Sequence, residues 1–147
     1  MRKDLQDQLV REFPQLFQDI NKPPTETCMC WGCECGDGWF WLLHDLCQNI
    51  MKADPTEATK FLQVKEKFGW LHVYISDSNE AIDKLIFDAG SESLHVCEFC
   101  GTREQVGSGW VRSWIRTICK PCAVKEYGEE VLLAEKNIWD TTEPFDE

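Results

Sequence analysis

Two C-x2-C pairs separated by eighteen residues constrain this chain more than any other feature of its sequence. Cys97 and Cys100 form the first pair, and Cys119 and Cys122 form the second. Two residues between cysteines let both sulfurs of a tight turn point at one ion, and the spacer is long enough for a hairpin that returns the second pair to the first. The pattern therefore predicts one closed site that holds a single structural Zn²⁺ ion.

Two other interpretations of these cysteines stay open at this level. The four thiols could lie unliganded in the core, or either C-x2-C pair could be a redox centre. Chance seldom gives two correctly spaced pairs, and no strand-then-helix context of the thioredoxin kind surrounds either one. Four thiolates would leave no open position for a water molecule, so we expect a structural rather than a catalytic ion.

The elements expected around this site are a knuckle, a hairpin, a second knuckle and a helix. Gly107-Ser108-Gly109 predicts the turn of the hairpin, and a helix is expected from Ala123 to Lys136. This order resembles a treble-clef zinc finger, which implies that the start of the helix supplies two of the ligands.

Apolar residues recur at helical spacing in three segments before the zinc segment. They predict helices over residues 5–17, 39–50 and 81–89. Pro14 should interrupt the first helix, because proline lacks an amide hydrogen, and Gly90 should end the last one.

Short polar residues and an alternating pattern add caps and a hairpin to this picture. Asp37 is expected to cap the middle helix, and Asp77 or Ser78 the last one. Residues 61–75 alternate between apolar and polar, with Gly69 as a turn, which predicts a β-hairpin.

We therefore expect an α+β fold, in which a small β-hairpin or sheet is packed by amphipathic helices and followed by a C-terminal treble-clef-like zinc module. Residues 1–94 should form the core, residues 95–136 the zinc module packed on that core, and residues 137–147 an acidic tail. A chain of 147 residues can bury a modest core of this kind.

A second group of cysteines precedes the middle helix. A second metal ion is possible there, although C-x-C spacing suits zinc less well than C-x2-C spacing. The alternative is a set of buried or free thiols in a glycine-rich loop. The residues concerned are Cys28, Cys30, Cys33 and Cys35.

Tryptophan and arginine alternate in the second half of the zinc segment. If this stretch is one strand, Trp110, Arg112, Trp114 and Arg116 share one face and form a candidate interaction surface. The alternative is that the tryptophans cover the neighbouring helix and the arginines balance the acidic tail.

Charge and composition limit the environment and the partners. The formal net charge is −11, which disfavours nucleic acid as a partner, and no apolar run is long enough to cross a bilayer. The amino terminus lacks the continuous apolar core of a secretion signal. With an odd number of cysteines, nine, and metal-type spacing, we expect a cytoplasmic location.

No sequence motif of a phosphate-binding loop, a nucleophile elbow or a zinc protease is present, so we assign no catalytic residue. An enzyme or a small-ligand-binding protein with a pocket near Asp37 stays open as an alternative.

Four blocks of sequence resemble, in order, a family of small zinc-knuckle proteins encoded by bacteriophages and bacterial genomes. The resemblance implies a phage or prophage accessory protein, located in the cytoplasm of a bacterial host, and no particular reaction. The extra cysteines 28 and 33 and the acidic extension depart from the family pattern. The blocks are Cys35-Gly-Asp-Gly-Trp-Phe, Gln63-Val-Lys-Glu-Lys-Phe-Gly, Cys97-Glu-Phe-Cys-Gly, and Gly109-Trp followed by Thr117-Ile-Cys.

These observations favour a non-enzymatic, zinc-stabilised protein that binds a host or phage protein and inhibits or regulates a host factor. A nucleic-acid-binding zinc finger that uses the tryptophan and arginine residues is the alternative. The sequence does not indicate an oligomeric state.

Overall fold

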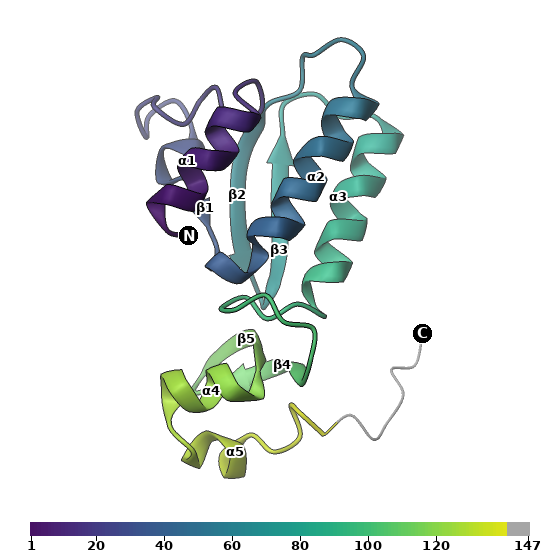
Figure 1. The fold of residues 1–147 in the computed structure, drawn as a ribbon. Coiled ribbons are helices and arrows are strands. Elements are labelled where there is room, and N and C mark those ends of the chain that lie inside the picture. Colours follow the sequence, from purple (N-terminus) through teal and green to yellow (C-terminus); the bar gives the residue numbers. More distant parts are fainter. Residues whose placement is uncertain (141–147) are drawn as a thin grey trace.

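Helices and strands of both kinds follow one another through residues 1–140, the part of the chain that the structure, a computed structural model, describes. The fold is α+β, as expected, with two small sheets and helices packed on them (Figure 1). In chain order the elements are α1 (Lys3–Glu12), η1 (Cys28–Trp31), β1 (Cys33–Glu34), η2 (Asp37–Trp39), α2 (Phe40–Ala53), β2 (Phe61–Lys67), β3 (Trp70–Ile75), α3 (Glu80–Ser93), β4 (Val106–Val111), β5 (Trp114–Cys119), α4 (Lys120–Tyr127) and α5 (Glu130–Ala134).

The first sheet has the order β1-β2-β3, and its β2–β3 hairpin confirms the prediction for residues 61–75. The short strand β1 pairs parallel to β2, with Cys33 opposite Val64. A strand of two residues is too short to show a periodic pattern, so β1 was not predicted.

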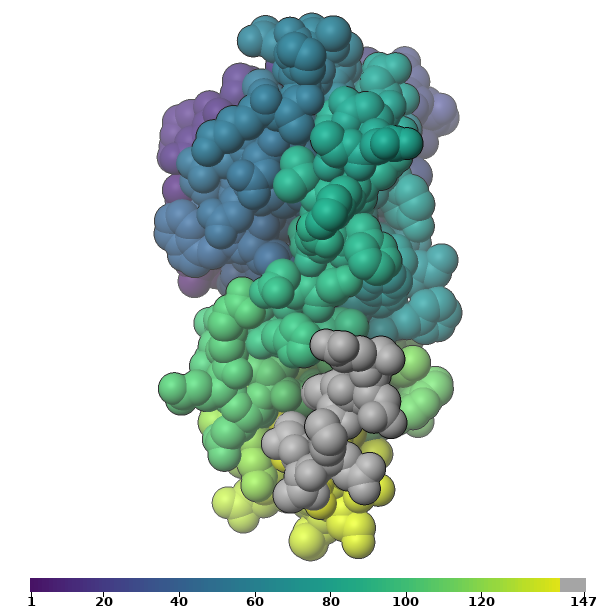
Figure 2. All heavy atoms as spheres, turned by 90° about the vertical axis from the view of Figure 1, so that its right-hand side faces the viewer, coloured from purple at the N-terminus to yellow at the C-terminus, as the bar shows by residue number. Residues whose placement is uncertain are grey.

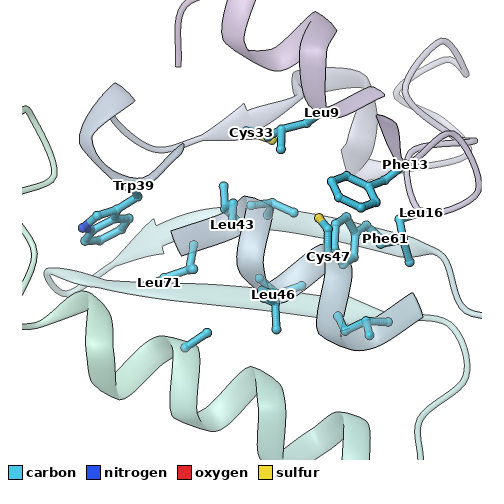
Figure 3. Close-up of a cluster of buried hydrophobic side chains, with 14 of the residues drawn as sticks. Leu9, Phe13, Leu16, Cys33, Trp39, Leu43, Leu46, Cys47, Phe61 and Leu71 are labelled. Carbon is cyan, nitrogen blue, oxygen red and sulfur yellow. The ribbon is translucent and has the colours of Figure 1, made fainter. Parts of the chain in front are cut away.

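Helices α2 and α3 cover one face of this sheet, while α1 lies beside β1 (Figure 1). Leu71 and Val73 of β3 belong to the main cluster of buried apolar side chains, in which Figure 3 shows Leu71. Helix α1 ends at Glu12, directly before Phe13 and Pro14, as the proline predicts.

The expected helix caps at residues 37 and 77–78 are wrong. The Asp37 carboxylate accepts a hydrogen bond from the Arg2 amide (2.6 Å), and α2 begins without a side-chain cap. Asn79 caps α3 instead, since its Oδ1 accepts from the Ile82 amide (2.9 Å). Gly90 lies inside α3, where a Cβ atom would approach the Leu71 carbonyl oxygen to 3.0 Å, so this glycine permits close packing of α3 on β3.

The hairpin of the zinc segment has its turn five residues later than expected. Arg112 and Ser113 form the turn with positive φ angles of 48° and 71°, while Gly107 and Gly109 lie within β4. A Cβ atom at Gly107 would overlap the backbone carbonyl of Ile138. These glycines therefore make room for the chain that crosses β4, and a turn signal was the wrong interpretation.

The single helix expected over residues 123–136 is also wrong. Two helices, α4 and α5, are separated at Gly128, whose φ of 86° ends α4. The start of the expected acidic tail is packed, because Ile138 and Trp139 join the second buried cluster and the Trp139 indole donates to the Ile118 carbonyl (3.0 Å). Residues 141–147 of that tail lie outside the described residues.

Two buried apolar clusters meet at residues 96–97, with the zinc segment below the core in the view of Figures 1 and 2. The Trp39 indole donates to the Val96 carbonyl (2.9 Å), and the Gly38 amide donates to the Glu98 carbonyl (2.8 Å). The Thr117 hydroxyl of β5 donates to the Gly69 carbonyl (2.5 Å) in the β2–β3 turn. Backbone groups therefore join the two parts at two separate places.

Candidate metal centre

Four cysteine sulfurs converge in the second part of the fold. The Sγ atoms of Cys97, Cys100, Cys119 and Cys122 all lie within 4.8 Å of one another, and Cys100 Sγ is 3.7 Å from Cys119 Sγ. A tetrahedron of thiolates around Zn²⁺, with bonds of about 2.3 Å, has edges of about 3.8 Å. The arrangement predicted from sequence therefore has the dimensions of a site that can hold one metal ion.

Local backbone structure explains why the sulfurs converge. In the first knuckle the Gly101 amide donates to the Cys97 carbonyl (2.9 Å), and Gly101 has a φ of 81°, which favours glycine. In the second knuckle Cys119 caps α4, and its sulfur accepts from the Cys122 amide (3.4 Å). The start of α4 thus supplies two of the four sulfurs, as expected.

Burial and hydrogen bonding shift the pKa values of these thiols in different directions. Burial raises the pKa of Cys119 to about 11 and also raises that of Cys122. Burial acts in the same direction on Cys100, but hydrogen bonds from the Thr102 amide and from the other thiols outweigh it and lower the pKa of Cys100. A divalent cation would stabilise the thiolate form of all four sulfurs.

The knuckle is held against the core by its own backbone and by the side chain of Glu98. Glu98 Oε1 accepts from the Gly36 amide (3.0 Å), and its backbone carbonyl accepts from the Gly38 amide (2.8 Å). At Gly38 an added Cβ would overlap the Cys97 carbonyl oxygen. The glycines on both sides of Asp37 therefore allow the first knuckle to pack closely against this segment. Neither the helix-cap nor the pocket hypothesis predicted this role.

The cysteines at positions 28 to 35 do not assemble in this way. Within residues 1–140, the cluster at positions 97 to 122 is the only group of three or more possible ligand side chains that converge on one position. Cys33 and Cys35 are buried, whereas Cys28 is exposed. Cys33 lies in the core, as does Cys47 of α2 (Figure 3). Cys28 and Cys30 lie in η1 and Cys33 lies in β1, and within residues 1–140 no three of these four sulfurs converge on one position.

The four-residue face of tryptophan and arginine is not formed, because a turn interrupts it. Trp110 lies on β4 opposite Ile115, and Trp114 lies on β5 opposite Val111. These are adjacent cross-strand pairs, so the two tryptophans do not lie at alternate positions of a single strand. Arg112, in the turn, donates to the Tyr127 carbonyl (2.7 Å) and to Glu130 (2.6 Å).

The acid that Arg112 pairs with, Glu130, lies in α5 and not in the acidic tail that the alternative interpretation named. Arg116 lies over the Trp114 ring, with 5.5 Å from its guanidinium carbon to the ring centroid. Within the described residues its Nε has no hydrogen-bond partner. Neither tryptophan is covered by a helix, since both side chains are exposed.

An aromatic groove of about 330 Å³ lies between the tip of the zinc hairpin and the β2–β3 turn. Its exposed walls include Phe68, Trp110 and Trp114, which are 68%, 60% and 58% exposed, and Ile115 also lines it. The backbone of Phe68 has a φ of 53°, which is unusual for a residue other than glycine. The conformation of the turn therefore sets the position of this ring. The sequence indicated the tryptophans but gave no sign that Phe68 would join them.

A second cavity, of about 470 Å³, adjoins Asp37 and lies between α2 and the first knuckle. It is lined by Asp37, Arg2, Trp41 and Arg103 among others, while Trp39 is fully buried. The β2–β3 hairpin does not line it. Three of its charged groups are already engaged, since Asp37 binds Arg2 and the Arg103 guanidinium binds Glu92 (2.9 Å).

Among residues 1–140, no helix has both the length and the apolar character that crossing a bilayer requires. Comparison of the chain with protein-family models, with curated proteins and with solved structures gives no match.

Proposed function

We propose that the four-cysteine cluster binds one Zn²⁺ ion and that residues 95–136 form a zinc module of the treble-clef kind. Thiolates are the ligands that Zn²⁺ prefers in structural sites, and four of them fill its tetrahedral shell. The order of knuckle, β4–β5 hairpin and α4 supports the treble-clef comparison. The residues that would hold the ion are Cys97, Cys100, Cys119 and Cys122.

The role of this zinc ion is to stabilise the module that carries a binding surface. Cys119 ends β5, the strand that carries Trp114, and Thr117 of the same strand fastens it to Gly69. The zinc module and the β2–β3 turn together form the aromatic groove. Because the ion has no open coordination position, the function that fits is binding rather than catalysis.

The chain then acts as a non-enzymatic accessory protein that contacts another protein through the aromatic groove. The observation that carries this proposal is the exposure of Phe68, Trp110 and Trp114 around one concave surface. Large aromatic residues clustered in a pocket are typical of the few side chains that dominate binding energy at protein interfaces. The resemblance to phage-encoded proteins supports a host or phage protein as the partner, and regulation of a host factor as the outcome.

Nucleic acid fits this groove less well than a protein does. Arg112 is engaged by Glu130 and Tyr127, so it does not face the groove as the sequence hypothesis required. The lining residues contain one lysine and one glutamate, Lys67 and Glu66, and so carry no net positive charge.

The experiment that tests the proposal is capture of a partner from bacterial lysate on the immobilised, zinc-loaded chain. Trp114→Ala should abolish stoichiometric capture, and calorimetry with the purified partner should show a loss of affinity of roughly 30-fold or more, because truncation of an aromatic hot spot costs about 2 kcal/mol or more. Phe68→Ser should act in the same direction.

The matched control is Phe87→Ala. Phe87 is 63% exposed on α3, but it does not line the groove, so its removal should leave capture unchanged. Absence of any stoichiometric partner, or equal loss in the Phe87 and Trp114 variants, would contradict the proposal.

A further inference from the structure

The rings that bound the aromatic groove stand apart from one another. Among the described residues, no two of Phe68, Trp110 and Trp114 form a ring contact. Aromatic side chains that pack on each other usually have ring centroids about 4.5–7 Å apart. The three rings therefore flank an open space of about 330 Å³ instead of filling it by packing together.

Two of these rings already carry a cation of this chain. Lys67 Nζ lies 5.8 Å from the centroid of the Phe68 ring, and the guanidinium carbon of Arg116 lies 5.5 Å from the centroid of the Trp114 ring. Their positive charges disfavour a third cation between the rings, whereas a neutral apolar group is compatible with both. The part of a ligand that lies between the rings should therefore be uncharged.

The groove also contains hydrogen-bond donors that no protein group uses. The indole N–H groups of Trp39 and Trp139 each donate to a backbone carbonyl, whereas within residues 1–140 those of Trp110 and Trp114 have no protein partner. An indole can only donate, and a donor that loses its water without gaining an acceptor weakens binding. A ligand that covers these rings should therefore bring free carbonyl oxygens.

Backbone conformation distinguishes the common ways in which a protein holds a peptide. An α-helix bonds its carbonyls internally, so it offers few acceptors to the indoles. Strand addition needs an unpaired strand edge, whereas this groove lies between the β2–β3 turn and the tip of the β4–β5 hairpin. A polyproline II segment has no internal hydrogen bonds, so its carbonyls are available and its proline rings supply neutral apolar surface.

Charge indicates which residues should flank such a segment. A second copy of this chain is disfavoured as the occupant, because both molecules would carry a formal net charge of −11. The same excess of acids favours a partner with basic residues. Glu66 lines the groove and its Oε1 accepts from the Gly69 amide (2.8 Å), but within the described residues its carboxylate forms no ion pair. This carboxylate can therefore pair with a basic residue of the ligand.

We propose that the aromatic groove binds a proline-rich segment of the partner in the polyproline II conformation, with a basic residue beside the prolines paired with Glu66. The prolines pack between the rings of Phe68, Trp110 and Trp114. This inference rests on the proposed function, because it names the kind of segment that the same groove takes. Polyproline II segments are already ordered before they bind, so a small groove can hold one at a low cost in conformational entropy.

The test is fluorescence anisotropy of the full, zinc-loaded chain with a labelled peptide of six prolines that ends in one arginine. Saturable binding is expected below about 1 mM protein. A peptide with alanine at every second proline should bind at least about fivefold more weakly, because it loses both apolar rings and stiffness. A peptide that ends in glutamate instead of arginine should bind about two- to fivefold more weakly, the range for one exposed ion pair.

Variants of the chain locate the peptide in the groove. Trp110→Ala should weaken binding by roughly 30-fold or more, as expected for an aromatic hot spot. Trp110→Phe keeps a ring but removes the indole donor, so the loss should be about 2- to 12-fold, the range for one hydrogen bond. Glu66→Gln keeps an acceptor for the Gly69 amide and should remove the preference for the peptide that ends in arginine. Phe87→Ala is the matched control and should leave binding unchanged.

The inference is overturned by the absence of saturable binding at about 1 mM protein, or by equal binding of the alanine-substituted peptide. Unchanged affinity in Trp110→Ala also overturns it, because the peptide would then lie elsewhere. If lysate capture still requires Trp114 in these cases, the proposed function stands and only the kind of segment is wrong. Proline-peptide binding that requires Trp110, without any captured partner, would support this inference and contradict the proposed capture.

Discussion

The chain contains two groups of four cysteines, and the structure gathers the sulfurs of one group into a cluster but not those of the other. Those at positions 97 to 122 bring all four sulfurs within 4.8 Å of one another. Those at positions 28 to 35 spread from the core to the surface, with Cys33 and Cys35 buried and Cys28 exposed. The number of cysteines is the same in the two groups, so the number alone does not make a metal site.

Backbone geometry explains the difference. A C-x2-C pair in a tight turn or at the start of a helix directs both sulfurs to one point, as the first turn of α4 does with Cys119 and Cys122. Cys33 and Cys35 are two residues apart on an extended segment, so both side chains point to the same side, here the core. The comparison teaches that the structure around each cysteine determines its chemistry.

Loss of one ligand from the converging group should have the largest effect. We expect Cys119→Ser to reduce bound metal from one equivalent to none and to unfold the zinc segment, because structural zinc sites contribute about 10–16 kcal/mol in isolated modules. Metal analysis and circular dichroism measure both changes, and a chelator should reproduce them in the unchanged chain.

The matched variant for this prediction lies in the other group. Cys35→Ser should retain one equivalent of metal, since its buried sulfur belongs to the core rather than to the cluster. Unchanged dichroism after complete removal of metal would contradict a structural role for the ion.

Gly38→Ala should give the next largest effect, because Gly38 packs against the first knuckle. The added Cβ would overlap the Cys97 carbonyl oxygen and lie 2.6 Å from the Gly101 amide nitrogen, and backbone atoms cannot turn aside. We expect a loss of about 1–3 kcal/mol in the free energy of unfolding, measured in urea.

Gly109→Ala provides the control for that substitution. Its Cβ would lie 2.9 Å from Ile138 Cγ1, an atom of a side chain that can adopt another rotamer, so the loss should be smaller. Equal losses in the two variants would show that the knuckle does not constrain Gly38.

The buried thiols should make the core sensitive to alkaline pH. Burial raises the pKa of Cys33 to about 12, whereas a thiol in the unfolded chain titrates near about 8.5. Above that lower value the unfolded state loses a proton that the folded state keeps, so stability present at neutral pH is lost as pH rises toward 12. One such thiol contributes a slope of at most about 1.4 kcal/mol per pH unit.

Unfolding in urea at several pH values between about 8 and 10 measures this slope. Cys33→Ala should make the dependence shallower, because it removes one of the thiols that titrate only in the unfolded state. An identical dependence in the variant and in the unchanged chain would show that Cys33 is not held as a neutral thiol.

Cys28→Ser should have the smallest effect. Cys28 is exposed, so the change in the free energy of unfolding should stay within about 0.5 kcal/mol, and the metal content should stay at one equivalent. A fall in bound metal in this variant would revive the hypothesis of a second site and remove the contrast between the two groups.

Strong periodicity and motif spacing allowed the sequence to predict much of the fold. The β2–β3 hairpin, the cores of α1, α2 and α3, and the four converging cysteines were all indicated by patterns confined to short segments. Patterns of this kind work because the residues that create them are close together along the chain.

The sequence-based predictions were wrong at residues whose role is to contact a segment far away in the chain. Gly107 and Gly109 resembled a turn, but their role is to make room for Ile138, and the actual turn is at Arg112 and Ser113. Asp37 resembled a helix cap, but its carboxylate binds the Arg2 amide thirty-five residues away.

By itself the sequence determined that four cysteines can surround one ion and that this ion would have no open position for chemistry. Only the tertiary structure decided which surfaces the ion supports. Phe68 is forty-two residues before Trp110, and the two line one groove because the two parts of the fold pack together, with Thr117 bound to Gly69 across the junction. The geometry of the four ligands depends on short segments, so residue spacing predicts it. A groove between two packed clusters depends on contacts between distant segments, which residue spacing does not predict.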